Sequence, residues 1–185
     1  MAFRIVIGDV TIGIQGQDFA YIFSVGMGGM ESLYKDGKEW LYRAPRPAFW
    51  RAATDNDRGN GFVFRSAIWS AADRFVRCVK VTARMDEQEI SMPPAPENNK
   101  YNGDETCDRF EISYTYETPT VPVTEVTVSY LVESDGRIHV QVDYLGKQGL
   151  PELPVLGLRF LMPTAAEGYT CLLYTSPSPR DRTRS

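Results

Sequence analysis

Residues 110–116 read Phe-Glu-Ile-Ser-Tyr-Thr-Tyr, so that apolar or aromatic side chains alternate with polar ones. Residues 126–132 repeat this alternation, and residues 138–144 repeat it once more after the turn sequence Ser134-Asp135-Gly136. Successive side chains of an extended strand point to opposite faces of a sheet, so this alternation indicates strands with one buried and one solvated face. The three runs therefore predict an antiparallel β-meander.

Shorter runs of β-branched and aromatic residues, bounded by Gly, Asp or Pro, extend this prediction along the chain. The expected strands are residues 3–7, 11–15, 19–25, 30–34, 38–41, 75–85 and 156–162. Asp36-Gly37 suits a tight hairpin turn between two of them. Helical propensity is confined to residues 67–73, which predicts at most two short helical turns, and residues 92–105 are expected to form a surface loop. The predicted fold class is all-β, an antiparallel β-sandwich.

The composition excludes several classes of protein. The chain has 185 residues, of which 43% are hydrophobic and 24% charged, which suits one globular domain and argues against disorder or a membrane span. A net charge of −4 provides no basic footprint, so neither nucleic acid nor a membrane is an expected partner. Three cysteines without a paired spacing and a single His cannot complete a zinc set. No secretion signal follows Met1, so we expect a cytoplasmic protein.

Residues 43–61 differ in character from the runs around them, because they combine two Pro and two Gly with several charged side chains. They predict one long loop, and Phe49 and Trp50 argue that it is ordered. These two rings could stack on a sugar or a base, or they could anchor the loop in the core. Asp55-Asn56-Asp57 could ligate a hard cation, although the EF-hand spacing is not met, or could order the loop through hydrogen bonds to the backbone.

The other residues that could carry chemistry indicate neither a catalytic group nor a metal ligand on this chain. His139 shares a strand face with Gln141 and Asp143 and is expected to be exposed. No G-x-S-x-G sequence is present to position a serine nucleophile. The glycines of residues 26–29 lie between two expected strands, so they predict a turn and not a phosphate-binding loop at a helix N-terminus.

Residues 46–61 read Arg-Pro-Ala-Phe-Trp-Arg-Ala-Ala-Thr-Asp-Asn-Asp-Arg-Gly-Asn-Gly. This run resembles the signature R-P-x-F-W-R-A-x-T-D-N-D-R-G of the C-terminal domain of family 2 β-galactosidases, which some bacteria make as a separate small subunit. Further similarity lies in residues 95–99, 103–106, 149–154 and 157–163, and the match runs from residue 3 to residue 170. The resemblance implies a large, many-stranded sandwich of the galactose-mutarotase type, here incomplete at its C-terminus.

The family's reaction is retaining hydrolysis by two glutamates about 5 Å apart, and both belong to a catalytic barrel on the large subunit. The resemblance therefore implies a non-catalytic component of an enzyme that removes terminal, non-reducing β-D-galactose from lactose-type substrates. It implies a heterodimer with the large subunit, no activity of this chain alone and no cofactor on it, although the family's barrel can bind divalent or monovalent cations. The stretch that forms a wall of the galactose pocket lies beyond the last matched residue.

Other interpretations stay open at this point. The chain could be a fragment of the C-terminal domain of a single-chain β-galactosidase, a stand-alone carbohydrate-binding β-sandwich, or a purely structural β-domain. The opening Met1-Ala2-Phe3, directly before the first expected strand, resembles the start of a separate small subunit and favours that interpretation.

Residues 171–185 depart from the family's pattern. Residues 171–181 read Cys-Leu-Leu-Tyr-Thr-Ser-Pro-Ser-Pro-Arg-Asp, which resembles a translated transposase-type sequencing adapter, with a natural basic Ser/Pro tail as the alternative. We therefore expect residues 1–170 to be the N-terminal part of a β-galactosidase small-chain domain. Residues 171–185 are expected to be a non-native tail with few contacts.

The candidate substrate-side or interface residues all lie in the signature. They are Phe49, Trp50, Arg51, Asp55, Asn56, Asp57 and Arg58. We expect their loop to be ordered, to project from the sandwich and to face the barrel of the large subunit. In this interpretation the two aromatic rings anchor the loop, the acidic and amide side chains accept backbone hydrogen bonds, and Arg51 and Arg58 stay available for a partner. The alternative is a loop that is internal to the domain.

Overall fold

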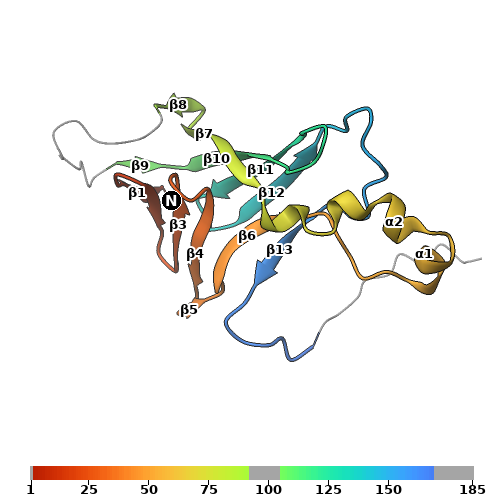
Figure 1. The fold of residues 1–185 in the computed structure, drawn as a ribbon. Helices are drawn as coiled ribbons and strands as arrows, with labels where there is room; N and C mark the ends of the chain where they lie inside the picture. Colours follow the sequence, from red (N-terminus) through yellow and green to blue (C-terminus); the bar gives the residue numbers. More distant parts are fainter. Residues whose placement is uncertain (1, 92–104, 169–185) are drawn as a thin grey trace, which may run out of the picture.

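A computed structural model describes residues 2–91 and 105–168, and two antiparallel β-sheets make up most of it (Figure 1). The first sheet has six strands in the order β5-β4-β3-β2-β1-β9. These are β1 (Phe3–Ile7), β2 (Thr11–Gln15), β3 (Phe19–Ser24), β4 (Gly29–Lys35), β5 (Lys38–Glu39) and β9 (Thr106–Cys107). The strands expected in this part of the sequence are confirmed. Asp36 and Gly37 form the expected hairpin turn, with φ values of 53° and 77°.

The second sheet contains the three alternating runs and has the order β12-β11-β10-β7-β8. Its strands are β7 (Arg77–Met85), β8 (Gln88–Ile90), β10 (Arg109–Glu117), β11 (Glu125–Glu133) and β12 (Ile138–Tyr144). The predicted antiparallel meander is confirmed, because β10 pairs with β11 and β11 with β12. Val140 on β12 is more exposed than the alternation predicts, because β12 lies at the edge of the sheet.

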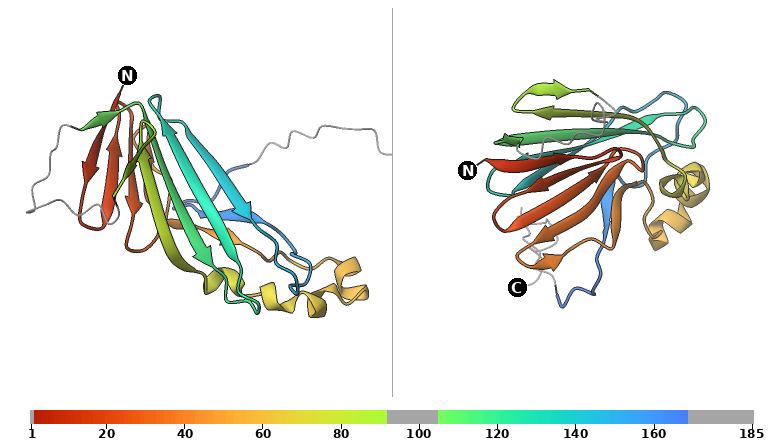
Figure 2. Two further views of the ribbon diagram at one scale, coloured as in Figure 1. Left: turned by 90° about the horizontal axis from the view of Figure 1, so that it is seen from above. Right: turned by 90° about the vertical axis from the view of Figure 1, so that its left-hand side faces the viewer.

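The two sheets lie face to face (Figure 2), and the side chains between them form an aromatic core. The core's largest rings are Phe3, Phe19, Tyr21 and Phe23 from the first sheet and Phe110, Tyr114, Tyr116 and Tyr130 from the second. Phe23 joins the sheets directly, with its ring centroid 5.7 Å from the centroids of both Phe110 and Tyr130. Burial of alternate side chains from both sheets is the packing of a β-sandwich, so the predicted fold class is confirmed.

The prediction of one long loop over residues 43–61 is wrong for residues 43–48 and for residues 55–59, which form regular elements. Residues 43–48 form strand β6 (Arg43–Ala48), which pairs with β13 (Gly157–Leu161) in a separate two-stranded sheet. Proline lacks a backbone N–H and is tolerated where a strand has a free edge. The two prolines therefore fit a two-stranded sheet, although they made a strand look excluded in the sequence.

The expectation of at most two helical turns is also wrong. After a short connection, the chain forms four successive helical pieces: α1 (Asp55–Gly59), α2 (Phe62–Arg65) and the 3-10 helices η1 (Ala67–Trp69) and η2 (Ala72–Arg74). Each is one or two turns long, and only the last two lie where helical propensity was expected. The helices α1 and α2 lie at the opposite end of the molecule from the N-terminus, beyond the ends of the strands (Figures 1 and 2).

Two further expectations fall outside the described residues: the surface loop, except for Glu105, and the tail of residues 171–185. Within residues 2–91 and 105–168, no helix has the length and apolar character that crossing a bilayer demands.

Candidate functional site

The signature sequence folds into α1 because its first residues form a capping box. The Thr54 hydroxyl accepts a hydrogen bond from the Asp57 backbone N–H at 3.2 Å, and the Asp57 carboxylate accepts one from the Thr54 N–H at 2.8 Å. These reciprocal bonds satisfy two backbone donors that a helix otherwise leaves unpaired at its start. The T-x-x-D spacing therefore sets the start of α1, and it is the signal that the loop prediction missed.

Asp57 also forms an ion pair with Arg51, which ties the connection before α1 to the helix at the start of the helical segment of residues 51–74. Its two carboxylate oxygens accept hydrogen bonds from Arg51 at 2.5 and 3.1 Å, in the two-pronged geometry that guanidinium and carboxylate groups favour. The hydrogen bond from Arg51, followed by that from the Thr54 N–H, holds the pKa of the Asp57 carboxyl well below its ordinary value. Arg51 also lies over the Phe62 ring, with 5.8 Å between its guanidinium carbon and the ring centroid.

Both arginines that were expected to be available for a partner have partners within the segment. Arg51 is bound to Asp57, and Arg58 lies 3.2 Å from Asp55 in an exposed pair three residues apart along α1. That expectation is therefore wrong for Arg51, whose donors are used to close the connection before α1. The exposed Arg58–Asp55 pair contributes little to stability and can rearrange.

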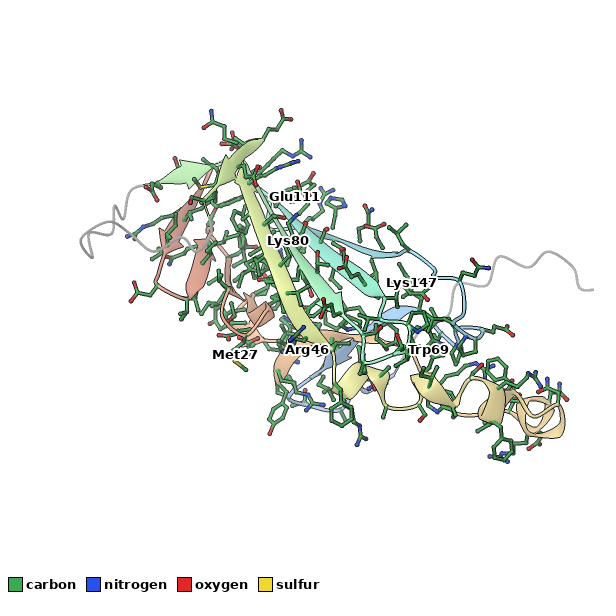
Figure 3. The ribbon with its side chains drawn as sticks, turned by 45° about the horizontal axis from the view of Figure 1, so that its top comes forward. Met27, Arg46, Trp69, Lys80, Glu111 and Lys147 are labelled. Carbon is green, nitrogen blue, oxygen red and sulfur yellow. The ribbon has the colours of Figure 1, made fainter. Side chains whose placement is uncertain are left out.

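The aromatic residues of the signature anchor the segment, as the sequence suggested. Phe49 is fully buried, and its ring centroid lies 5.6 Å from that of Trp69, which in turn meets Tyr144 edge to face at 6.1 Å. Trp50 is half-buried against the same cluster. The rings therefore fill a second, smaller core between the helical pieces and β12, in which Trp69 is labelled in Figure 3. Because its ring is buried there, Phe49 is not available for stacking on a sugar.

Hydrogen bonds also attach η1 to a distant part of the chain. The Ser66 hydroxyl donates to the Glu152 carbonyl oxygen at 2.9 Å, and the Trp69 indole N–H donates to the Pro151 carbonyl oxygen at 3.2 Å. Pro151 and Glu152 belong to the Gly-Leu-Pro-Glu-Leu-Pro stretch that carried part of the family resemblance. Leu150 and Leu153 also pack against the cluster that contains Phe49, so the two matched stretches belong to one packed unit.

The outer surface of this unit combines charged side chains with one large aromatic ring. Asp55 is 99% exposed, Asn56 and Arg58 are also exposed, and Phe64 on α2 is 85% exposed. The sequence analysis did not single out Phe64. The signal was its place two residues after buried Phe62, since in a four-residue helix these two positions cannot both face the interior.

The structure also locates the remaining sequence candidates. His139 is exposed, as expected, and its Nε2 lies 3.3 Å from a Glu133 carboxylate oxygen on the neighbouring strand. In residues 2–91 and 105–168 no three His, Cys, Asp or Glu side chains form a group that could hold a metal ion. The Asp57 oxygens are bound by Arg51 and the Thr54 N–H, so Asp55-Asn56-Asp57 acts as a helix start.

The fold and this unit define a class: an antiparallel β-sandwich that carries a short, internally braced helical segment (residues 51–74) at one end. The family described as β-galactosidase small chain matches residues 15–172, and this chain belongs to that family.

Relatives support the same assignment. The chain is 55% identical over 162 residues to a β-galactosidase small subunit of Latilactobacillus sakei, which covers 88% of this chain and 51% of that protein. It is 41% identical over 157 residues to a β-galactosidase of Clostridium acetobutylicum and 33% identical over 157 residues to one of Streptococcus thermophilus. Those two alignments cover 85% of this chain but only 15% and 13% of the longer proteins. The chain thus spans about half the length of the small subunit and a minor part of the other two.

Proposed function

We propose that this chain is a non-catalytic small-subunit component of a β-galactosidase, which acts with a barrel-bearing large subunit on terminal β-galactosides such as lactose. The observation that carries the proposal is that the family signature folds into a braced segment whose outer side chains, Asp55, Arg58 and Phe64, are exposed to solvent. A rigid element with an exposed aromatic ring suits docking, because little conformational entropy is lost on binding.

The Asp57 carboxyl group of the signature fits a non-catalytic role. A glycosidase acid needs a raised pKa, so that it still carries its proton at neutral pH. The pKa of Asp57 is lowered instead, because Arg51 and the Thr54 N–H bind its charged form. Asp57 is therefore suited to bracing the segment and not to donating a proton.

Reconstitution tests the proposal. The chain alone should not hydrolyse a chromogenic β-galactoside, whereas addition of a β-galactosidase large subunit from the same source should form a complex and raise the large subunit's activity. Turnover by the isolated chain would contradict the non-catalytic role. Absence of both a complex and an activity gain would contradict the small-subunit role. Calorimetric binding of galactose by the chain alone would instead support a stand-alone carbohydrate-binding domain.

We also propose a cytoplasmic location for the assembly. Among the described residues, Cys78 and Cys107 are free thiols. Unpaired cysteines are usual in a reducing compartment. Fractionation of the native host should find the chain and the galactosidase activity together in the cytoplasm, and recovery outside the cell membrane would contradict this location.

A further inference from the structure

A broad groove lies beside the two-stranded sheet, and one of its lining residues, Val76, also packs against the aromatic cluster of Phe49 and Trp69. It has a volume of about 860 Å³ and is formed by β6, β13, η2 and the start of β4. Its charged lining residues are Arg43, Arg46, Arg74, Arg159, Glu31 and Asp73, and its apolar lining includes Met27, Val76 and Leu161. Arg46 and Met27 lie close together at this face of the molecule (Figure 3).

The charge of this groove is opposite to that of the chain as a whole. Four arginines face two acidic residues, a surplus of two positive charges, whereas the complete chain carries a net charge of −4. Two of the arginines already have partners: Arg159 is paired with the mostly buried Asp73, and Arg46 donates to the Met27 carbonyl oxygen at 3.1 Å. A local surplus of positive charge with little screening attracts anionic groups.

Arg43 and Arg74 are the two arginines that remain to bind something else. Both are exposed, and within residues 2–91 and 105–168 neither guanidinium group has a hydrogen-bond or ion-pair partner. They come from different elements, Arg43 from the start of β6 and Arg74 from η2, yet both line the same groove. A guanidinium group binds a carboxylate through two parallel hydrogen bonds, so the pair can hold a segment that carries two acidic side chains.

The apolar residues around the groove favour a protein over a small anion as the occupant. Met27 is 68% exposed at the groove, and Val76 and Leu161 add further apolar surface to its lining. Met and Arg are both enriched at the buried centre of protein interfaces.

We infer that this arginine groove docks an acidic surface segment of a partner protein, with Arg43 and Arg74 binding its carboxylates. The inference rests on the proposed function, which makes the large subunit that partner. The groove is then a contact region separate from Asp55 and Phe64, and it contributes charge complementarity where the α2 surface contributes an aromatic anchor.

The test reverses the charge of the two free arginines in the full chain. The double variant Arg43→Glu/Arg74→Glu should bind the large subunit about tenfold or more weakly at about 0.05 M salt, and the loss should shrink at about 0.5 M salt as the charges are screened. The neutral variant Arg43→Gln/Arg74→Gln should show a smaller loss in the same direction. Neither variant should change the melting temperature of the free chain, because both side chains are exposed and unpaired among the described residues.

The matched control makes the same total change of charge elsewhere. Lys38→Glu/Lys80→Glu replaces two exposed lysines outside the groove and should leave the affinity near that of the wild type. Equal losses from both double variants would overturn the inference, since only net charge would then matter, and so would no loss from the arginine variants. If the wild-type chain itself forms no complex, the proposed function and this inference fail together. If the wild-type chain forms the complex and the arginine variants bind as tightly as the wild type, the inference alone fails.

Discussion

The sandwich and the helical segment of residues 51–74 are held together by different physics. In the sandwich, stability comes from a continuous core in which rings from two sheets interlock, and each buried side chain is one of many. The helical segment has four pieces of three to five residues each, too short to be stable alone. It depends on one capping box, one two-pronged ion pair and the anchoring rings of Phe49 and Trp69.

This difference shows how a small β-domain can present a rigid surface. The segment is held together by the Arg51–Asp57 ion pair and by the buried rings around Phe49, so its outer side chains are not needed for its stability. Phe64 and Asp55 can then serve recognition, whereas a substitution in the sandwich affects the fold first.

The largest effect is expected in the sandwich core. Phe110→Ala removes a fully buried ring between the sheets, and we expect the free energy of unfolding to fall by about 3–5 kcal/mol. Denaturant unfolding of the purified chain measures this loss. A loss below about 1 kcal/mol would show that the sheets do not pack as described and would remove the contrast between the two regions.

A smaller and more local effect is expected where the segment joins the rest of the chain. Ser66→Ala removes the hydrogen bond to the Glu152 carbonyl oxygen and should cost about 0.5–1.5 kcal/mol. Hydrogen exchange should show faster exchange in α2 and η1, with β10 and β11 unchanged. Ser70→Ala, in an exposed position of the same segment, is the matched control. Equal loss of protection in the sandwich would show that the two regions unfold as one unit.

The Asp57 carboxylate makes part of the segment's stability depend on pH. Its pKa is lowered in the folded chain, so its contribution is complete above the unfolded value of about 3.9 and is lost as the pH falls below that value. Asp57→Asn should therefore melt at a lower temperature than the wild type at neutral pH, and the difference should shrink near pH 3. Asp55→Asn removes an exposed carboxylate that does not bind Arg51, and it is the matched control. A difference that is constant with pH would contradict the Arg51–Asp57 ion pair.

The sequence predicted the sandwich well and the helical segment only in part, and the reason is physical. A strand with one buried face requires alternation, so residues 110–116 and 126–132 carried their structure in a pattern readable without any tertiary contact. Helices of one turn have no such periodicity, and the capping box at Thr54 is a signal of only two residues. The ion pair between Arg51 and Asp57 could not be predicted from the sequence, because it depends on how the chain bends between the two residues.

The burial of Phe49 and the pairing of β6 with β13 also differed in how far the sequence could predict them. The anchoring role of Phe49 follows from its large apolar area, and the structure confirms it. The pairing of β6 with β13 could not be foreseen, because the partners lie more than a hundred residues apart and the prolines opposed a strand. The arginine groove is formed in part by these paired strands, so no local sequence motif could predict it.

The most direct test of the central claim, that the braced segment serves docking while the sandwich serves folding, is a paired measurement on Phe64→Ala. The free energy of unfolding of the free chain and its affinity for the large subunit are measured together, with Val10→Ala as a control that removes an exposed apolar side chain at the β1–β2 turn. We expect Phe64→Ala to change stability by less than about 0.5 kcal/mol and to weaken binding by about tenfold or more. The control should change neither. Unchanged affinity in Phe64→Ala, or a loss of stability large enough to explain weaker binding, would contradict the account.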